Sequence, residues 1–402
     1  MKFPIGGIVR EQFCRKWLDS ITDSIVWMKE VIFFVALYKG FFIGSIMSKF
    51  MKRAIEIASY AKENVYPNPK VGAVIVKDNF IISEGYHELY GSNHAEINAL
   101  NKYDGNLNGA TLYVTLEPCN HIGKTPPCTD AIIDSGINKV IIGTVDPNPK
   151  VSGSGIKRLK DSGIAVECGC LEEECLRLNK HYNFFMKYNK PFITSKMALS
   201  LDGKYSTDKG ESKWITSKKS RLDVHNERSK YQSILVGVQT IIEDNPRLNV
   251  RDIEGFEKQP TRIVLDTNGR IPIDSNVLND ELSTIIFTAN MKQSKQKKIE
   301  NRYNKIIFVE TKNNLLDLDS VLKQLSLLNI QSVLVEGGRK VHESFIRERK
   351  VNSVIVYMAS KFIGGINSLN NIDVNRISNA ITLKNTEFEI IENDIKVKGD
   401  IG

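Results

Sequence analysis

The most informative segment of the chain is TLEPCNHIGKTPPC, residues 115–128, in which Cys119 and Cys128 lie nine residues apart. Upstream of it the chain reads NHAE, which places His94 two residues before Glu96. One imidazole and two thiolates suit Zn²⁺, and three protein ligands leave the fourth tetrahedral position to a water molecule. Zinc lowers the pKa of such a water towards neutrality. The motif therefore predicts one catalytic zinc ion per chain, held by His94, Cys119 and Cys128.

Glu96 is the residue that gives this zinc motif a reaction. A glutamate beside the histidine can carry a proton from water to a leaving amine without binding the metal, as in nucleobase deaminases. The alternative is a closed structural zinc site, which usually takes four ligands from short Cys-x2-4-Cys pairs. Only His121 could complete such a site within the loop. We favour a hydrolytic deaminase site and expect His121 to line its substrate pocket.

Length and charge set limits on the rest of the molecule. The 402 residues are enough for two domains of roughly 150 to 200 residues each. The net charge is +8, and residues 1–50 account for three of these charges, with seven Lys and Arg against four Asp and Glu. The remaining excess is too diffuse to indicate nucleic acid, but it suits a phosphate-bearing small molecule. Four further cysteines, expected as free thiols, fit a reducing cytoplasm; they are Cys14, Cys168, Cys170 and Cys175.

The first fifty residues differ from the rest of the chain. Residues 25–47 are strongly apolar, but Lys29, Glu30 and Lys39 interrupt them. A membrane-spanning helix needs roughly 18 to 20 apolar residues, so no span is expected. The segment also lacks the small-residue cleavage site of a secretory signal. A surface anchor, a targeting extension and translated sequence upstream of a start at Met47 or Met51 remain open, and we favour the last.

The first part of the chain after this extension alternates between helix and strand patterns. Helices are expected at 51–64, 94–100, 129–136 and 171–188, and strands at 71–78, 80–87, 110–118 and 139–146. This pattern predicts a mixed α/β sheet, with Cys119 at a strand end and Cys128 at a helix start. Two Asn-Pro loops, Pro67–Pro69 and Asp146–Lys150, flank these strands. Asn68 could hydrogen-bond a pyrimidine, although a plain turn explains the same residues equally well.

A second α/β pattern begins near residue 190. Strands are expected at 191–198, 233–241, 261–267, 283–289, 305–310, 332–338 and 353–359, with helices at 318–329 and up to Arg349. Short buried strands that alternate with helices favour a mainly parallel sheet. The Gly337-Gly338 pair after one strand could let backbone N–H groups approach a phosphate. Because no GxGxxG fingerprint occurs, an ordinary Rossmann domain is not expected.

Together these segments resemble the bifunctional pyrimidine deaminase/reductase family of riboflavin biosynthesis, from about Met51 to the C-terminus. The matching segments of the first domain are PNPKVGAVIV, GYHELYGSNHAEINAL, TLYVTLEPCNHIGKTPPCTDAI and DPNPKVSGSGI. Those of the second domain are KMALSLDGK, GESKWIT, GVQTIIEDNPRLNVR and LVEGG. The order and spacing of these segments make a chance match very improbable.

The resemblance implies an α/β fold in which a zinc cytidine-deaminase-like three-layer domain precedes a dihydrofolate-reductase-like domain. Residues 1–50 would be an N-terminal extension, 51–189 the deaminase domain and 190–402 the reductase domain. The implied reactions are hydrolytic deamination of a diaminopyrimidinone ribotide and then reduction of its ribosyl group to a ribityl chain by NADPH. The family resemblance also implies a cytoplasmic homo-oligomer that binds this phosphorylated substrate and no nucleic acid.

The resemblance also implies roles for individual residues. Glu96 would carry protons in the deaminase, and Lys196 and Asp244 would polarise the sugar in the reductase. The positions that match cofactor contacts are Ala198, Trp214, Thr240, Asp244, Thr267, Gly338, Arg339, Lys340, Val341, His342, Glu343 and Ser344. The positions that match substrate contacts are Ser212, Arg228, Leu248, Arg251 and Glu336, to which we add Asn68. Ser217, Lys218 and Thr267 are the nearest candidates for holding the 2′-phosphate of NADPH.

Three local departures from the family pattern stand out. Asn120 replaces the usual serine after the first cysteine, and Ser360 replaces a usual proline. Residues 229–233 read SKYQS where the family commonly ends in Asp-Ala. None of these changes touches a predicted metal ligand, but the last one bears on the shape of the reductase pocket near Arg228.

Overall fold

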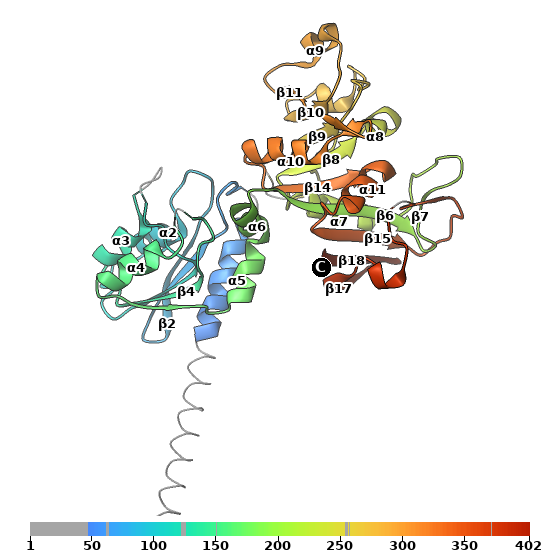
Figure 1. The fold of residues 1–402 in the computed structure, drawn as a ribbon. Coiled ribbons are helices and arrows are strands. Elements are labelled where there is room, and N and C mark those ends of the chain that lie inside the picture. Colours follow the sequence, from blue (N-terminus) through green and yellow to red (C-terminus); the bar gives the residue numbers. More distant parts are fainter. Residues whose placement is uncertain are drawn as a thin grey trace, which may run out of the picture.

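The computed structural model describes residues 47–61, 64–121, 126–149, 151–253, 256, 258–370 and 372–402. These residues form two α/β units, each built on its own sheet (Figure 1). Residues 1–46, which hold nearly all of the apolar N-terminal stretch, lie outside the described part, and so do 122–125 of the cysteine loop. Among the helices that are described, none is long and apolar enough to cross a membrane.

The first sheet has five strands in the order β2-β1-β3-β4-β5. They are β1 (Gly72–Lys77), β2 (Phe80–Tyr86), β3 (Thr111–Leu116), β4 (Lys139–Thr144) and β5 (Ala165–Cys168). Strand β1 is antiparallel to β2 and β3, whereas β3, β4 and β5 are parallel, so the sheet is mixed as expected. Asp78 and Asn79 have φ of 50° and 65°, the left-handed conformation that a two-residue hairpin turn requires.

Helices cover both faces of this sheet. They are a helix over residues 47–59, α2 (Ala95–Asn101), α3 (Cys128–Asp134), α4 (Ser154–Asp161), α5 (Glu172–Leu178) and α6 (Lys180–Tyr188). Because side chains alternate along a strand, Ile75 packs in the core formed with α2 and α3, whereas Val74 packs with Phe50 and Met51 of the 47–59 helix. This is the three-layer arrangement that the resemblance implies.

The second sheet has nine strands in the order β11-β10-β9-β8-β14-β6-β15-β18-β17. They are β6 (Phe192–Ser200), β8 (Ser233–Gly237), β9 (Thr261–Leu265), β10 (Thr284–Thr288), β11 (Asn304–Phe308), β14 (Ser332–Gly337), β15 (Ser353–Ala359), β17 (Leu383–Ile391) and β18 (Asp394–Ile401). Every neighbouring pair from β11 to β15 is parallel, whereas β18 is antiparallel to both β15 and β17. The sheet is therefore mainly parallel, as the apolar runs predict.

Helices and short strands complete this second unit. The helices are α7 (Lys218–Arg228), α8 (Val238–Asp244), α9 (Gln293–Ile299), α10 (Leu318–Leu327) and α11 (Arg339–Arg347), with 3-10 turns η1 (Asn276–Leu278) and η2 (Ile377–Asn379). The short strands are β7 (Lys204–Ser206), β12 (Thr311–Lys312), β13 (Leu315–Leu316) and β16 (Ile366–Asn367).

Three expected elements differ from the structure. The strand expected at 233–241 ends at Gly237, and helix α8 follows directly, because a short apolar run fits a buried helix as well as a strand. The helix expected at 171–188 breaks at Asn179, whose side chain exchanges two hydrogen bonds of 2.8 Å with the backbone of Lys70. The helix expected from Met51 already includes residues 47–50.

Candidate active sites

The three predicted zinc ligands meet at the ends of α2, β3 and α3. His94 precedes α2, Cys119 follows β3, and Cys128 opens α3. Their ligand atoms all lie within 4.8 Å of one another, and Nδ1 of His94 is 3.3 Å from Sγ of Cys128 and 3.5 Å from Sγ of Cys119. Tetrahedral zinc with usual Zn–N and Zn–S lengths separates such atoms by about 3.5 Å. The residues therefore fit a zinc ion without rearrangement.

The electrostatics of the two thiols suit the same ion. Their mutual hydrogen bond lowers the pKa of the Cys119 thiol well below its usual value and raises the pKa of the Cys128 thiol. A divalent cation between the two sulfurs would favour the thiolate form of both. Cys128 also lies at a helix N-terminus, where the dipole favours a thiolate.

Glu96 lies in the first turn of α2, directly beside the cluster. Only 3% of its surface is exposed, and burial raises the pKa of its carboxyl to about 7. A carboxyl that titrates near neutrality can both accept and return a proton, which general acid–base catalysis requires. The close packing of α2 on β2 fixes this position, since a Cβ at Gly85 would lie 2.4 Å from the backbone nitrogen of Ala99.

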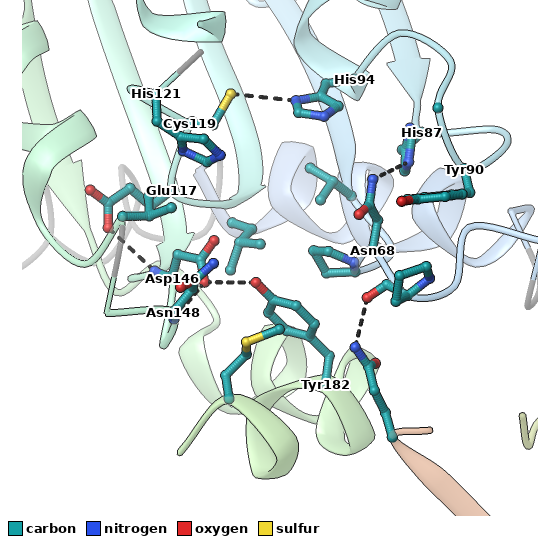
Figure 2. A pocket seen from close by; sticks show the side chains of 18 of the residues that line it. Asn68, His87, Tyr90, His94, Glu117, Cys119, His121, Asp146, Asn148 and Tyr182 are labelled. Atoms are coloured by element: carbon teal, nitrogen blue, oxygen red, sulfur yellow. Dashed lines mark hydrogen bonds between the residues drawn. The ribbon is translucent and has the colours of Figure 1, made fainter. Parts of the chain in front are cut away.

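Asn68 and His87 form one wall of the pocket in front of the cluster (Figure 2). Nδ1 of His87 lies 2.9 Å from the carbonyl oxygen of Asn93, which can only accept, so Nδ1 carries the proton. Nε2 of His87 then accepts a 3.1 Å hydrogen bond from Nδ2 of Asn68. Burial lowers the pKa of His87, which keeps the ring neutral in this role. The oxygen of Asn68 is therefore left to accept a donor from a ligand.

The pocket has a cavity volume of about 330 Å³, enough for a small molecule. His121 lines it as expected, together with Asp146 and Asn148 from the second Asn-Pro loop. Lys150, at the end of that loop, lies outside the described residues. Two further lining residues, Asn329 and Gln331, come from the segment between α10 and β14 of the second unit.

Sequence reasoning missed two residues that shape this pocket. Glu117 accepts hydrogen bonds from the backbone nitrogens of Gly153 (2.9 Å) and Gly155 (2.9 Å), which anchors the start of α4. Tyr182 of α6 donates to Oδ1 of Asp146 at 3.0 Å (Figure 2). The position of Glu117 between β3 and Cys119 is the signal that could have found it. Tyr182 carries no such signal, because it lies in an ordinary amphipathic helix.

A second group of polar residues lies at the carboxyl end of β14. Arg228 binds both carboxylate oxygens of Glu336 at 2.7 Å, and Nζ of Lys196 is 3.7 Å from the same carboxylate. The Arg228 and Lys196 charges hold the pKa of Glu336 at about 2 although burial opposes this. Arg228 also donates to the carbonyl oxygen of Asn249, next to Leu248 and close to Arg251. The structure thus brings Arg228 and Glu336, two of the predicted substrate contacts, into direct contact.

The Gly337-Gly338 pair lies beside this group, between the end of β14 and the start of α11. Oγ1 of Thr240 would lie 3.3 Å from a Cβ at Gly337, so a side chain at this position would crowd Thr240 of α8. His342 of α11 is buried and hydrogen-bonds Oγ of Ser195 at 2.8 Å, which ties α11 to β6. The predicted cofactor positions Thr240 and Gly338 therefore lie close to each other at the start of α11.

The remaining predicted positions lie in more exposed places. Trp214 is 65% exposed under the guanidinium of Arg221, and Ser212 is exposed too. Asp244 pairs with Lys213 at 2.9 Å, whereas Lys196 pairs with Glu336 at 3.7 Å.

The positions suggested for a 2′-phosphate are only partly available. The backbone nitrogen of Ser217 donates to Asp394, and the side chain of Ser217 caps α7, so Ser217 is already engaged beside a carboxylate. The carbonyl oxygen of Thr267 accepts from Ala289. Ala198 lies on β6, opposite Tyr357 of β15.

All three departures from the family pattern have contacts in the structure, and Oγ of Ser360 donates to the carbonyl oxygen of Asn393. Asn120 accepts a 3.0 Å hydrogen bond from Thr129, near the start of α3. In the SKYQS stretch, Tyr231 donates to Thr194 and stacks at 4.9 Å on His181 of α6. Because Arg228 keeps its Glu336 partner, the changed residues serve the contact between the two units and leave that ion pair in place.

Comparison with known proteins gives the family. Residues 45–144 match the cytidine and deoxycytidylate deaminase zinc-binding region, and residues 191–397 match the RibD C-terminal domain. The RibD riboflavin biosynthesis protein of Aquifex aeolicus is 40% identical over 355 residues, which cover 88% of this chain and 98% of that protein. The chain belongs to the RibD family. It is a bifunctional deaminase and reductase of riboflavin biosynthesis, with a zinc-binding deaminase domain and a reductase domain that uses a nicotinamide cofactor.

Other RibD proteins agree in sequence and in fold. RibD of Bacillus amyloliquefaciens is 43% identical over 79% of this chain and 85% of its own length. The structure of Acinetobacter baumannii RibD superposes with a TM-score of 0.82 at 33% identity, over 89% of this chain and 99% of that one. The Thermotoga maritima deaminase/reductase gives a TM-score of 0.80 at 38% identity with the same coverage. The deaminase-like and reductase-like fold expected for the two units is therefore confirmed.

Proposed function

We propose that residues 51–189 deaminate a diaminopyrimidinone ribotide and that residues 190–402 then reduce its ribosyl group with NADPH. The observation that carries this proposal is the meeting of His94, Cys119 and Cys128 beside Glu96 in a pocket that Asn68 lines. The second observation is the buried Arg228–Glu336–Lys196 group in the other domain.

In the deaminase, a zinc ion held by His94, Cys119 and Cys128 would supply an activated water molecule. Glu96 would take a proton from that water and deliver it to the leaving amine, a role that its raised pKa suits. The side-chain oxygen of Asn68 accepts a hydrogen bond from an N–H of the pyrimidine, because the Nδ2 group of Asn68 is already engaged with His87. The ring is thereby oriented with the 2-amino carbon towards the zinc position. Ammonia is the product that leaves.

In the reductase, NADPH supplies the hydride that reduces the ribosyl carbon. Arg228, Glu336, Ser212, Leu248 and Arg251 are the proposed contacts of the ribotide. Burial lowers the pKa of Lys196, which makes its ammonium a better proton donor to the sugar oxygen as the ring opens. Asp244 is the second proposed group for polarising the sugar.

The proposed NADPH contacts extend over β6, α8 and the start of α11. They are Ala198, Trp214, Thr240, Asp244, Thr267 and residues 338–344. The approach of Thr240 to the Gly337-Gly338 pair supports a phosphate at this helix start, because backbone N–H groups of a helix N-terminus favour anions.

We further propose a cytoplasmic homo-oligomer that forms through the C-terminal hairpin. Strand β17 is an edge strand, and its residues 383–390 are all exposed, including Phe388 at 73% and Ile390 at 80%. An exposed apolar edge strand is a ready surface for pairing with a second chain. The mass of the purified protein in sedimentation velocity, compared with that of Phe388→Asp, tests this interface.

The zinc proposal is tested by metal analysis. Protein purified without chelators should hold one zinc ion per chain, and Cys128→Ala should lose both the metal and the release of ammonia. Its reductase should remain active on the deaminated ribotide. Full deaminase activity in Cys128→Ala would rule out the proposed ligand set.

A further inference from the structure

The deaminase pocket is completed by the reductase domain. Its lining residues Asn329 and Gln331 lie between α10 and β14, on the far side of the domain boundary. All the zinc-site residues, in contrast, come from the deaminase domain. A residue of one catalytic domain thus forms part of the wall of the other domain's pocket.

Gln331 is fixed by its own sheet before it reaches the pocket. Its backbone nitrogen donates to the side chain of Gln232, and its carbonyl oxygen accepts from the backbone of Phe192 at 2.8 Å. Its side-chain Nε2 then donates to the carbonyl oxygen of Pro67 at 2.8 Å. Because a carbonyl can only accept, this contact fixes the orientation of the amide.

The side chain of Gln331 destabilises the fold at this position. The residue is fully buried, and its Oε1 has no hydrogen-bond partner among the described residues. A buried acceptor without a partner destabilises a fold, so an apolar side chain would serve packing better. The bond to Pro67 is the one visible function of the amide.

The same deaminase loop, residues 65–69, receives a second donor from the reductase domain. Nζ of Lys258 donates to the carbonyl oxygen of Tyr66 at 2.9 Å, and the hydroxyl of Tyr66 reaches the carbonyl oxygen of Lys230 at 3.5 Å. The carbonyl groups of Tyr66 and Pro67 are the two that immediately precede Asn68. Donors from the reductase domain therefore hold the backbone on which Asn68 is carried.

Asn68 connects this loop to the metal site. Its amide binds His87, and the ring of His87 lies edge-on to His94 with centroids 5.4 Å apart. A shift of the 65–69 loop would move the oxygen of Asn68 relative to the zinc ligand. Figure 2 shows Asn68, His87 and His94 following one another along this wall of the pocket.

We propose that Gln331 and Lys258 of the reductase domain are positioning residues for deamination, which act by holding the 65–69 loop so that Asn68 faces the substrate. This inference rests on the proposed contact between Asn68 and the pyrimidine. It means that the deaminase pocket reaches its working geometry only while the reductase domain is docked on it.

The test uses the full-length zinc enzyme and two hydrogen bonds at the domain junction. Gln331→Glu keeps the shape of the side chain but replaces the amide donor with a carboxylate, which repels the oxygen of Pro67. It should lower kcat/KM for ammonia release about tenfold, mainly through KM, as expected when a contact that binds substrate and transition state alike is weakened. Zinc content and NADPH oxidation with the deaminated ribotide should stay at wild-type values.

Ser326→Ala is the matched control. Oγ of Ser326 donates to the carbonyl oxygen of Asn189 at 2.9 Å, a bond at the same junction that does not involve the 65–69 loop. This variant should leave both activities unchanged. Lys258→Met changes an exposed side chain, so it keeps the test open if Gln331→Glu does not fold, and it should also raise KM for deamination. Unchanged deamination in both loop variants would overturn the proposal.

A double-mutant cycle asks whether Gln331 acts through Asn68. In the Asn68→Ala background, Gln331→Glu should change kcat/KM by less than about twofold, because the group that it positions is gone. An equal loss in both backgrounds would contradict the proposed route. The single Asn68→Ala variant reports separately on the proposed function, since unimpaired deamination there would refute the substrate contact while leaving the reductase-domain contacts to be measured.

Discussion

Glu96 is expected to transfer protons without binding the metal. It lies beside the three zinc ligands, but these already account for the usual protein share of a catalytic site. We expect Glu96→Gln to keep zinc and to lose deamination by about three orders of magnitude or more, because proton transfer and water activation act together. Ammonia release, zinc content and reduction of the deaminated ribotide are the three measurements. A parallel loss of both activities in a folded variant would contradict two independent sites.

Other residues show where sequence reasoning reached its limit. The spacing of His94, Glu96, Cys119 and Cys128 carried enough chemistry to predict a cluster, and the structure brings the four together. Gln331 could not be found in this way, because its partner Pro67 is 264 positions away and a lone glutamine has no motif. The pairing of Glu336 with both Arg228 and Lys196 depends likewise on three strands and helices meeting in space.

The 47–59 helix is expected to contribute to the stability of the deaminase domain. Phe50 and Met51 are buried, and the ring of Phe50 lies 5.3 Å from that of Tyr113 on β3. A protein that starts at Met47 should keep both activities and full stability. One that starts at Met51 lacks Phe50 and should lose about 3 kcal/mol of unfolding free energy in the deaminase domain. Urea denaturation of the two proteins distinguishes them, and equal stabilities would show that Phe50 does not contribute to the core.

Helix α11 should make the reductase domain sensitive to acid through His342. Burial lowers the pKa of His342 to about 4, against 6.5 in an unfolded chain. The unfolded state therefore binds the proton first as pH falls. Stability is fully present above pH 6.5 and is lost progressively between pH 6.5 and 4, by about 2 kcal/mol at pH 5.

Replacing the titrating group measures this effect directly. His342→Asn keeps a polar side chain near Ser195 but cannot be protonated in this range. The stability difference between wild type and variant in urea unfolding should shrink by about 2 kcal/mol from pH 7.5 to pH 5. Parallel losses in the two proteins would show that other groups cause the acid sensitivity.

Secondary-structure elements were predicted best where the sequence pattern fitted only one type of element. The strands β1, β4 and β14 came directly from apolar runs. Helix α8 did not, since residues 238–241 continue the apolar run of β8 and no local signal marks the change. The β17–β18 hairpin was also missed, because an edge strand that is exposed on both faces lacks the alternation by which strands are recognised.

Cofactor choice is a property of the whole reductase domain. The sequence lacks the GxGxxG loop and the acidic residue that usually marks NAD binding. A 2′-phosphate held by charge-assisted hydrogen bonds can favour its cofactor by roughly a hundredfold or more. We therefore expect kcat/KM with NADPH to exceed that with NADH by about this factor for the deaminated ribotide. Equal efficiencies would indicate a pocket that is open at the adenosine end.

The two active sites of the molecule should work in a fixed order on one ribotide. A coupled assay with the diaminopyrimidinone ribotide measures ammonia release and NADPH oxidation in the same sample. The wild-type enzyme should release ammonia before it oxidises NADPH. Cys128→Ala should oxidise NADPH only when it is supplied with the deaminated ribotide. Oxidation of NADPH by Cys128→Ala with the diamino substrate would contradict the account, because the reductase would then not depend on prior deamination at the zinc site.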